Sequence, residues 1–559
     1  MSSTVTAPAA NNTVPRRAPA VVMRLARMGS AHPTRLSFLR IMLRRMTSGA
    51  WHFDRPKWTI DPNGVGRAVY RAKGPDRTYS LVVFAHDLPD HLRSDRVIAT
   101  AWDATFALFD GEPSESDLDR LEANVPLQEA GRISARELSL SRANRSVRLF
   151  SHVVDRLSQG SQPDRAEVEA VGYLMRTTAV YGSGKFGAAD RRDLSGRLEL
   201  AEPFQAEMLS VWLTRQFTVD IVEHLARAKG GTKAVPLHPD LKRGLGVGNS
   251  TGLGMAPFLV RHPMLLDHWM VVREEALSRV RSCEKADAKS VAELRLAHQR
   301  AVENARKWHS DHPFQRLKLQ ALVRDLDQIA VQVSVFPGPN PRPWDALWQW
   351  GEANLSLEGQ EALLALLLEP HGDIVDGLAT CMAADESAAF RIQGKMPLAE
   401  LRRVLLDRYD WALRLDFSDP KQSTRFWYVS EEKLEPRLGE RASEDGAERE
   451  QPLCIAKLTQ ELARDCAAYD DATTVAEFLL AHPEHRLMAR RLQIAARFPY
   501  AEVQDNLIAA EMRPIDLMRC KLAFFGASRF DPRSDKWVRI SLFQDCPYPL
   551  DLQQDPPND

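Results

Sequence analysis

The stretch Gly244-Leu-Gly-Val-Gly-Asn-Ser-Thr-Gly-Leu-Gly-Met-Ala-Pro-Phe258 is where this sequence departs most clearly from an ordinary helical chain. Five of its residues are glycines, and Asn249, Ser250 and Thr251 stand among them. Each glycine costs backbone entropy, so this density indicates a loop with positive φ angles or a very close neighbour. Pro257 suits the first turn of a helix, whose free N–H groups attract anions. We therefore predict a ligand-binding loop here, although close packing of two helices would also explain the glycines.

A second glycine-dense loop, Tyr181-Gly-Ser-Gly-Lys-Phe-Gly187, follows a stretch that contains Arg176. It is not a P-loop, because the Gly-x-x-x-x-Gly-Lys-Ser/Thr spacing is absent and Phe186 occupies the position of the hydroxyl residue. Lys185, between glycines, can reach a carboxylate or phosphate of a ligand, and Arg176 can bind the same ligand. The alternative is that Lys185 is a solvated surface lysine without a ligand. The substrate-binding residues that we expect from the two loops are Lys185, Arg176, Ser183, Asn249, Thr251 and Gly252.

Ser250 is the centre of Gly248-Asn-Ser-Thr-Gly252, which has the letters of the Gly-x-Ser-x-Gly nucleophile elbow. That elbow also requires a preceding strand, and none is evident in the sequence. Donation of hydrogen bonds from Asn249 and Ser250 to a substrate oxygen is therefore favoured over nucleophilic attack. His262 and His268 follow the loop and are candidates for proton transfer. The predicted catalytic residues are His262, His268 and Ser250.

A metal site is considered only at His309 and His312, which form a His-x-x-His pattern around Asp311. Two or three ligands at this common spacing are too few to indicate a metal centre. A histidine near a helix end more often caps the helix or interacts with its dipole. We therefore expect no metal site, and the sequence identifies no cofactor.

Composition limits the function classes. The 559 residues contain 74 Lys and Arg against 75 Asp and Glu, a net charge of −1 that gives no basic excess for binding nucleic acid. Six scattered cysteines without a Cys-x-x-Cys pair fit reduced thiols in the cytoplasm. The longest apolar run, Ala362–Leu368, is far shorter than the roughly 18 residues of a membrane span. We expect a cytoplasmic protein that binds a small anionic molecule, without a transmembrane segment and compatible with homo-oligomer formation.

Changes in composition also divide the chain. Residues 1–50 contain eight arginines and no acidic residue, and four prolines lie within residues 336–343. Gly74-Pro75-Asp76-Arg77 lies between two strand-like runs and predicts a hairpin turn. Thr474 and Glu477 have the spacing of a capping box at a helix start. The predicted parts are a basic disordered tail (1–50), a small antiparallel β unit (51–125), a helical core with both glycine-rich loops (126–330), a Pro-rich linker (331–345) and a helical C-terminal region with short strands (346–559).

The predicted fold class is α+β and predominantly helical, with a small antiparallel sheet near the N-terminus and short strands in the C-terminal part. The predicted function is an enzyme of lyase or hydrolase type. It would use acid–base chemistry on a small anionic or carbonyl-bearing metabolite bound between the two glycine-rich loops. The alternative is a non-enzymatic helical interaction or scaffold protein that docks through its basic N-terminal tail.

Overall fold

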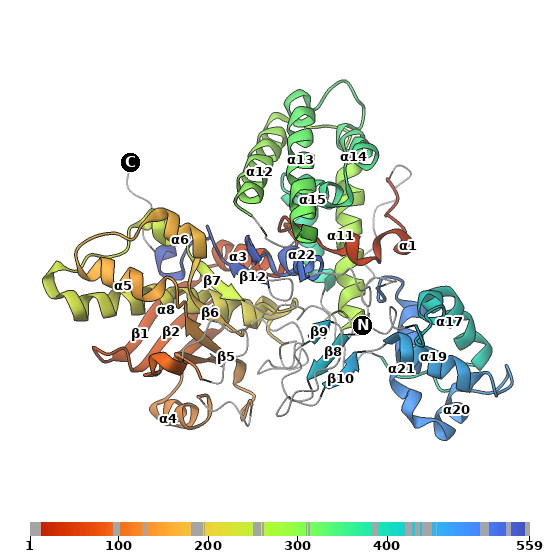
Figure 1. Ribbon diagram of the computed structural model, residues 1–559, viewed down its shortest axis with the longest axis horizontal. Helices are drawn as coiled ribbons and strands as arrows, with labels where there is room; N and C mark the ends of the chain where they lie inside the picture. Colours follow the sequence, from red (N-terminus) through yellow and green to blue (C-terminus); the bar gives the residue numbers. More distant parts are fainter. Residues whose placement is uncertain are drawn as a thin grey trace.

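The structure is a computed structural model of the chain (Figure 1). Among the residues that it describes, no helix combines the length and the apolar character needed to cross a bilayer. The described residues are 13–92, 101–126, 131–179, 194, 196–249, 259, 262–308, 310, 313–382, 390–419, 427–430, 436–438, 450–453, 455–503, 514–532 and 538–553.

A nine-stranded sheet is the largest element of the fold, and its strands come from distant parts of the chain. Their order across the sheet is β1-β2-β3-β4-β5-β6-β7-β12-β11. Neighbouring strands are antiparallel except β6 and β7, which run parallel. The strands are β1 (His52–Ile60), β2 (Gly66–Lys73), β3 (Thr78–Ala85), β4 (Ala104–Asp110), β5 (Glu137–Arg145), β6 (Tyr173–Thr177), β7 (Gly246–Asn249), β11 (Arg529–Pro532) and β12 (Val538–Leu542).

Both faces of the sheet are covered around β3 and β4, so nearly every residue of these two strands is buried. Successive side chains of a strand point to opposite faces. Tyr70 and Leu81 therefore join the main core together with helix α8 (Gln205–Gly230), while the adjacent Val69 and Val82 pack with Leu118 of helix α4 (Glu115–Asn124). The two faces thus belong to two separate hydrophobic clusters.

Helices make up most of the rest of the chain, and Figure 1 shows α12 to α15 grouped apart from α17 and α19 to α21. A three-stranded sheet holds β8 (Trp427–Ser430), β9 (Pro436–Leu438) and β10 (Glu450–Leu453). The α-helices are α1 (Pro19–Val22), α2 (Leu25–Met28), α3 (Phe38–Ser48), α4 (Glu115–Asn124), α5 (Phe150–Ser158), α6 (Arg165–Val171), α8 (Gln205–Gly230), α9 (Pro239–Arg243), α11 (Pro263–Arg281), α12 (Ala288–Lys307), α13 (Pro313–Val335), α14 (Pro343–Asn354), α15 (Leu357–Leu368), α16 (Gly372–Val375), α17 (Leu398–Leu413), α19 (Ile455–Cys466), α20 (Val475–Ala481), α21 (Arg486–Arg497) and α22 (Pro514–Phe525).

The prediction of a small antiparallel sheet near the N-terminus is wrong, because the sheet is large and mixed. Strands β5, β6 and β7 lie inside the part that we expected to be a helical core, residues 126–330. A short buried strand such as Tyr173–Thr177 has no apolar–polar alternation, so its sequence does not distinguish it from a buried helix. The pairing of β12 with β7, through Ile540 and Asn249, joins segments too distant for any local pattern to reveal.

Two local predictions are confirmed. Lys73 pairs with Thr78, so residues 74–77 form the hairpin turn between β2 and β3. Thr474 and Glu477 form a reciprocal capping box at the start of α20. That helix packs with α17, α19 and α21 around a further hydrophobic cluster, separate from the two at the sheet, which contains Leu401, Phe478 and Leu492.

The prediction of a disordered tail is wrong for residues 13–50, which form helices α1 to α3 and contribute to the main core. Arg17 is buried and makes ion pairs with Glu274 of α11 and Glu361 of α15. The acidic residues missing from this segment are therefore supplied by helices far along the chain. Segment composition cannot reveal such partners, and it therefore made a folded segment look disordered.

The predicted linker at residues 331–345 does not separate two domains. Helix α13 continues to Val335, a short turn follows, and Pro343 begins α14 in a position that proline favours. Phe336 and Trp344 pack against each other with their ring centroids 4.7 Å apart, and both belong to the main core. The prolines therefore shape a tight connection between two helices of one core.

Candidate anion-binding site

The two strands that lead into the glycine-rich loops lie side by side. Strand β6 ends at Thr177 and β7 ends at Asn249, and the two strands run parallel. Parallel neighbours place their carboxyl ends at the same edge of a sheet, so both loops begin from adjacent points. In open sheets, ligands bind beyond the carboxyl ends of parallel strands.

Asn249 ties these two strand ends to helix α22. Its Nδ2 donates a hydrogen bond of 3.1 Å to the carbonyl oxygen of Thr177, and its Oδ1 accepts a hydrogen bond from Nζ of Lys521. The side chains of all three residues are buried. The amide therefore fixes the spacing of the two strands and the position of the lysine.

Lys521 is a fully buried cation on α22. Burial disfavours the charged ammonium and lowers the pKa of Lys521 from its usual 10.5 to about 7. A lysine with this pKa changes its protonation state readily near neutral pH. It can therefore act as an anion-binding charge or as a proton donor and acceptor.

A second cationic group lies on the other face of the sheet. Gly248 approaches Arg176 and Tyr173 so closely that a Cβ atom at residue 248 would lie 2.8 Å from Cγ of Arg176 and 2.8 Å from the ring of Tyr173. Arg539 of β12 donates a hydrogen bond of 3.4 Å from Nη1 to the hydroxyl of Tyr173. Alternation along β7 directs residue 248 and Asn249 to opposite faces, so Arg176 and Lys521 flank the strand ends from two sides.

Arg176 and Lys521 are the cations on which the proposed site depends. Both are buried, at 8% and 0% relative exposure.

Of the sequence-predicted site residues, the structure brings Arg176 and Asn249 together at the strand ends. His262 instead precedes the first turn of α11, and His268 lies farther along that helix with its ring 5.9 Å from the ring of Phe498. His268 therefore belongs to the packing of α11 against the end of α21, and His262 marks the start of α11. The predicted residues Lys185, Ser183, Ser250, Thr251 and Gly252, and likewise His309, Asp311 and His312, lie outside the described residues.

One premise of the sequence interpretation needs correction. No strand was evident before Ser250, yet β7 occupies Gly246–Asn249 and ends directly before it. The glycines hid this strand, because glycine is depleted in strands and weakens them. At residue 246 a glycine is required by contact, since a Cβ there would lie 2.4 Å from the carbonyl oxygen of Leu542 on β12. The strand requirement of the Gly-x-Ser-x-Gly elbow is therefore met.

Sequence reasoning missed Lys521, Arg539 and Tyr173. A signal for Lys521 was available: Met518-Arg-Cys-Lys-Leu-Ala-Phe-Phe525 places two cations in an otherwise apolar stretch, and charged residues are rarely buried without a function or partner. Arg539 and Tyr173 have no comparable signal, because a polar residue in a strand is normally read as solvent-facing.

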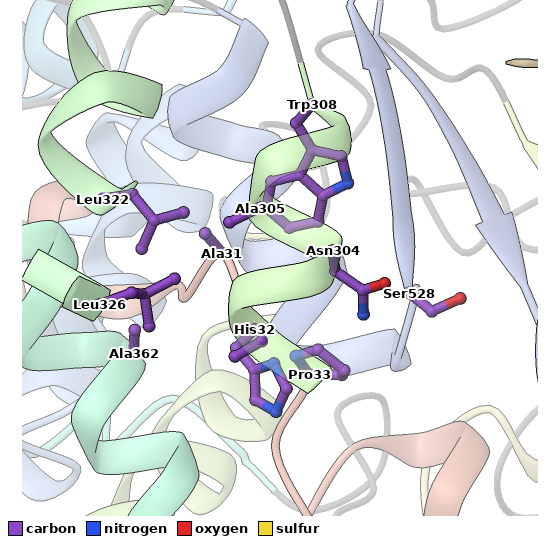
Figure 2. A pocket seen from close by; sticks show the side chains of 11 residues that line it. Ala31, His32, Pro33, Asn304, Ala305, Trp308, Leu322, Leu326, Ala362 and Ser528 are labelled. Carbon is purple, nitrogen blue, oxygen red and sulfur yellow. The ribbon is translucent and has the colours of Figure 1, made fainter. Parts of the chain in front are cut away.

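The hollow shown in Figure 2 is a less suitable site. It has room for about one water molecule, and its labelled wall includes the apolar side chains of Leu322, Leu326 and Trp308. Burial lowers the pKa of His32, at its edge, to about 4, so this imidazole is neutral at physiological pH. A charged metabolite does not fit there.

An open groove between α5 and the end of α8 is also lined by charged residues. Its arginine and lysine form ion pairs with carboxylates. Nε of Arg145 lies 3.6 Å from Oδ1 of Asp103, and Nζ of Lys229 lies 2.7 Å from Oδ1 of Asp155. These pairs reduce the attraction of the groove for an anion. The carboxyl ends of β6 and β7 are therefore the better candidate.

Chemically, the strand ends combine guanidinium and ammonium groups with an amide that positions them. Such a set binds carboxylate or phosphate oxygens and, through Lys521, can exchange a proton. Comparison of the chain with protein-family models, with curated proteins and with solved structures finds no match.

Proposed function

We propose that the protein is an enzyme of hydrolase or lyase type that binds a small anionic or carbonyl-bearing metabolite beyond the carboxyl ends of β6 and β7. The observation that carries this proposal is the placement of two buried cations, Arg176 and Lys521, at adjacent strand ends that both lead into glycine-rich loops. Cations at such a position complement a negatively charged ligand.

In this proposal Arg176 binds the anionic group of the metabolite, because a guanidinium can make two parallel hydrogen bonds to a carboxylate or phosphate. Asn249 is a positioning residue, since its amide already bonds to Thr177 and Lys521. We assign further ligand contacts to Ser183, Lys185, Thr251 and Gly252, on the evidence of the sequence alone.

Lys521 is the proposed proton donor and acceptor, because a group with a pKa of about 7 is present in both protonation states at neutral pH. Ser250 follows β7 directly and is the proposed nucleophile or hydrogen-bond donor to the reacting oxygen. This assignment replaces His262 and His268, whose helix packs against α21.

The alternative function, docking through a basic N-terminal tail, has lost its main support. Arg35, Arg40 and Arg45 of this segment form ion pairs with Asp376, Glu369 and Glu202, as Arg17 does with its own partners. Arginines matched within the fold are not available as a docking arm.

We further propose a cytoplasmic location. Cys283, Cys381, Cys466, Cys520 and Cys546 are free thiols in the described part of the chain, which suits a reducing compartment. The proposed partner is a small molecule rather than a nucleic acid, because the chain as a whole has a net charge of −1.

The test is a thermal-shift screen of the purified protein against inorganic phosphate, phosphorylated metabolites and small carboxylates. A ligand that binds the folded state raises the melting temperature by mass action. The best anion is then titrated calorimetrically into Arg176→Gln and Lys521→Met. We expect roughly 10- to 100-fold weaker binding in each variant, because a charge-assisted hydrogen bond contributes about 1.5–3 kcal/mol.

Lys229→Met is the matched control, since it removes one positive charge from an exposed site and leaves the strand ends unchanged. It should bind the anion as the parent does. If no anion in the screen stabilises the protein, or if all three variants retain parental affinity, the proposed site is wrong.

A further inference from the structure

A second group of chemically active side chains lies in the C-terminal helical part, at the junction of α19 with the turn between α20 and α21. Asp465 lies near the end of α19, His482 follows α20, and Glu484 and His485 belong to the 3-10 turn η5 (Pro483–His485). One ligand atom from each of these four residues lies within 4.8 Å of the other three.

The two imidazoles are held in fixed orientations by Phe478. Its ring stacks on His482 at 5.0 Å and on His485 at 5.7 Å, measured between ring centroids. Nε2 of His482 lies 3.1 Å from the hydroxyl oxygen of Tyr469, a hydrogen bond that directs the other ring nitrogen, Nδ1, toward Glu484. Metal-binding histidines are typically oriented by such an outer hydrogen bond.

The inward-facing atoms have the separations that a small cation requires. Nδ1 of His482 lies 3.2 Å from Oε1 of Glu484, and Nε2 of His485 lies 2.8 Å from Oδ2 of Asp465. Around a four-coordinate ion with bonds of about 2.0–2.1 Å, adjacent ligand atoms lie about 3.3 Å apart. Small side-chain adjustments therefore bring the four atoms to coordinating distance.

The ligand set also favours a cation, because it includes the carboxylates of Asp465 and Glu484. Arg464 donates from Nε to Oδ1 of Asp465 at 2.9 Å and, over the longer distance of 3.4 Å, from Nη2 to Oδ2. The His485 side chain is 4% exposed and that of Glu484 is 60% exposed, so the group is open to solvent on one side only.

We propose that Asp465, His482, Glu484 and His485 form a binding site for a divalent transition-metal ion of the zinc class. Two imidazoles and two carboxylates suit such ions, whereas magnesium and calcium prefer ligand sets made of oxygen alone. The ion would join the end of α19 to the turn before α21 and so stabilise this helical part. The proposal is independent of the anion site and of the enzymatic function.

The test uses full-length protein freed of metal with a chelator and then titrated with Zn²⁺ by calorimetry and with Co²⁺ by visible absorption. We expect one ion per chain, the intense d–d bands of a four-coordinate cobalt site, and a rise in melting temperature with Zn²⁺. His482→Ala should weaken binding at least a hundredfold and Glu484→Gln at least tenfold. Both side chains are partly exposed, at 28% and 60%, so these variants are expected to fold.

His238→Ala is the matched control, because His238 and Asp240 form a similar His–carboxylate pair on the surface, with 3.7 Å between Nδ1 and Oδ2. It should bind both ions as the parent does. The proposal is overturned if the parent binds no Zn²⁺ or Co²⁺. It is also overturned if His482→Ala retains parental affinity and an unchanged cobalt spectrum.

Discussion

Two regions of the molecule bury positive charge, and they do so in opposite ways. Arg17, in the N-terminal segment, lies between the carboxylates of Glu274 and Glu361, and these anions raise its pKa above the usual value. Lys521, at the strand ends, donates to the neutral amide of Asn249, and burial lowers its pKa. The first cation is compensated within the fold, whereas the second has a chemical environment that favours losing its proton.

The comparison teaches how to separate structural from functional buried charge. A buried ion pair contributes mainly to uniqueness of packing. Removing one partner of the pair leaves the other charge buried and uncompensated. A buried lysine whose pKa approaches neutrality is expensive to maintain, and such groups are concentrated at functional sites. Three variants test whether the two regions differ in this way.

The largest effect is expected from Arg17→Met. Removing this guanidinium leaves Glu274 and Glu361 buried with only part of their compensation, because Arg273 still pairs with both carboxylates. We expect a loss of about 3–5 kcal/mol in the free energy of unfolding. Urea unfolding measures this loss of stability. The anion affinity per folded molecule should equal that of the parent. A selective loss of anion affinity would contradict the difference that we draw between the two regions.

A smaller effect is expected from Gly248→Ala at the strand ends. The added methyl group would lie 2.8 Å from Arg176 and from Tyr173, so the arginine must move. Overpacking of this kind costs about 1–3 kcal/mol, and anion affinity measured by calorimetry should fall at least tenfold. Gly377→Ala is the control, because no atom lies within 4 Å of the new methyl group, and its stability should change by less than about 0.5 kcal/mol. Equal anion affinity in the two variants would contradict a ligand-binding role of Arg176.

The smallest effect concerns pH. A lysine whose folded pKa is near 7 and whose unfolded pKa is near 10.5 binds more protons when unfolded, so its contribution to stability rises with pH between these values. Between pH 7 and 8.5 the parent should therefore gain about 1.5 kcal/mol relative to Lys521→Met. Urea unfolding of both proteins at each pH measures this difference, in which other titrating groups cancel. A difference that does not change with pH would show that Lys521 stays protonated and would remove it as a proton donor and acceptor.

The parts of the fold that sequence could predict are those set by residues close together. The turn at residues 74–77 and the capping box of Thr474 and Glu477 depend on contacts within a few positions, and both are confirmed. The sheet and the N-terminal segment depend on partners far along the chain. Ile540 pairs with Asn249, and Arg17 pairs with Glu361, so composition and periodicity could not reveal either.

The candidate site shows the same division. Glycine density drew attention to the loops after Arg176 and after Asn249, and their strands are neighbours. Lys521 could not be placed from sequence, because its position depends on α22 packing against a strand that the glycines concealed. The loop residues themselves lie outside the described part of the chain, so their roles stay predictions.

The position of β12 in the sheet has a consequence for biosynthesis. Strand β7 has β6 on one side, but its other side is completed only by β12, whose residues leave the ribosome long after those of β7. Until then β7 is an edge strand, with backbone hydrogen-bonding groups available to strands of other chains. Lys521 and Arg539 are also made after β7, so a nascent chain can fold much of the sheet and still hold an unfinished site. Slow synthesis of the chain between β7 and β12 would therefore prolong exposure of this edge and favour aggregation over maturation.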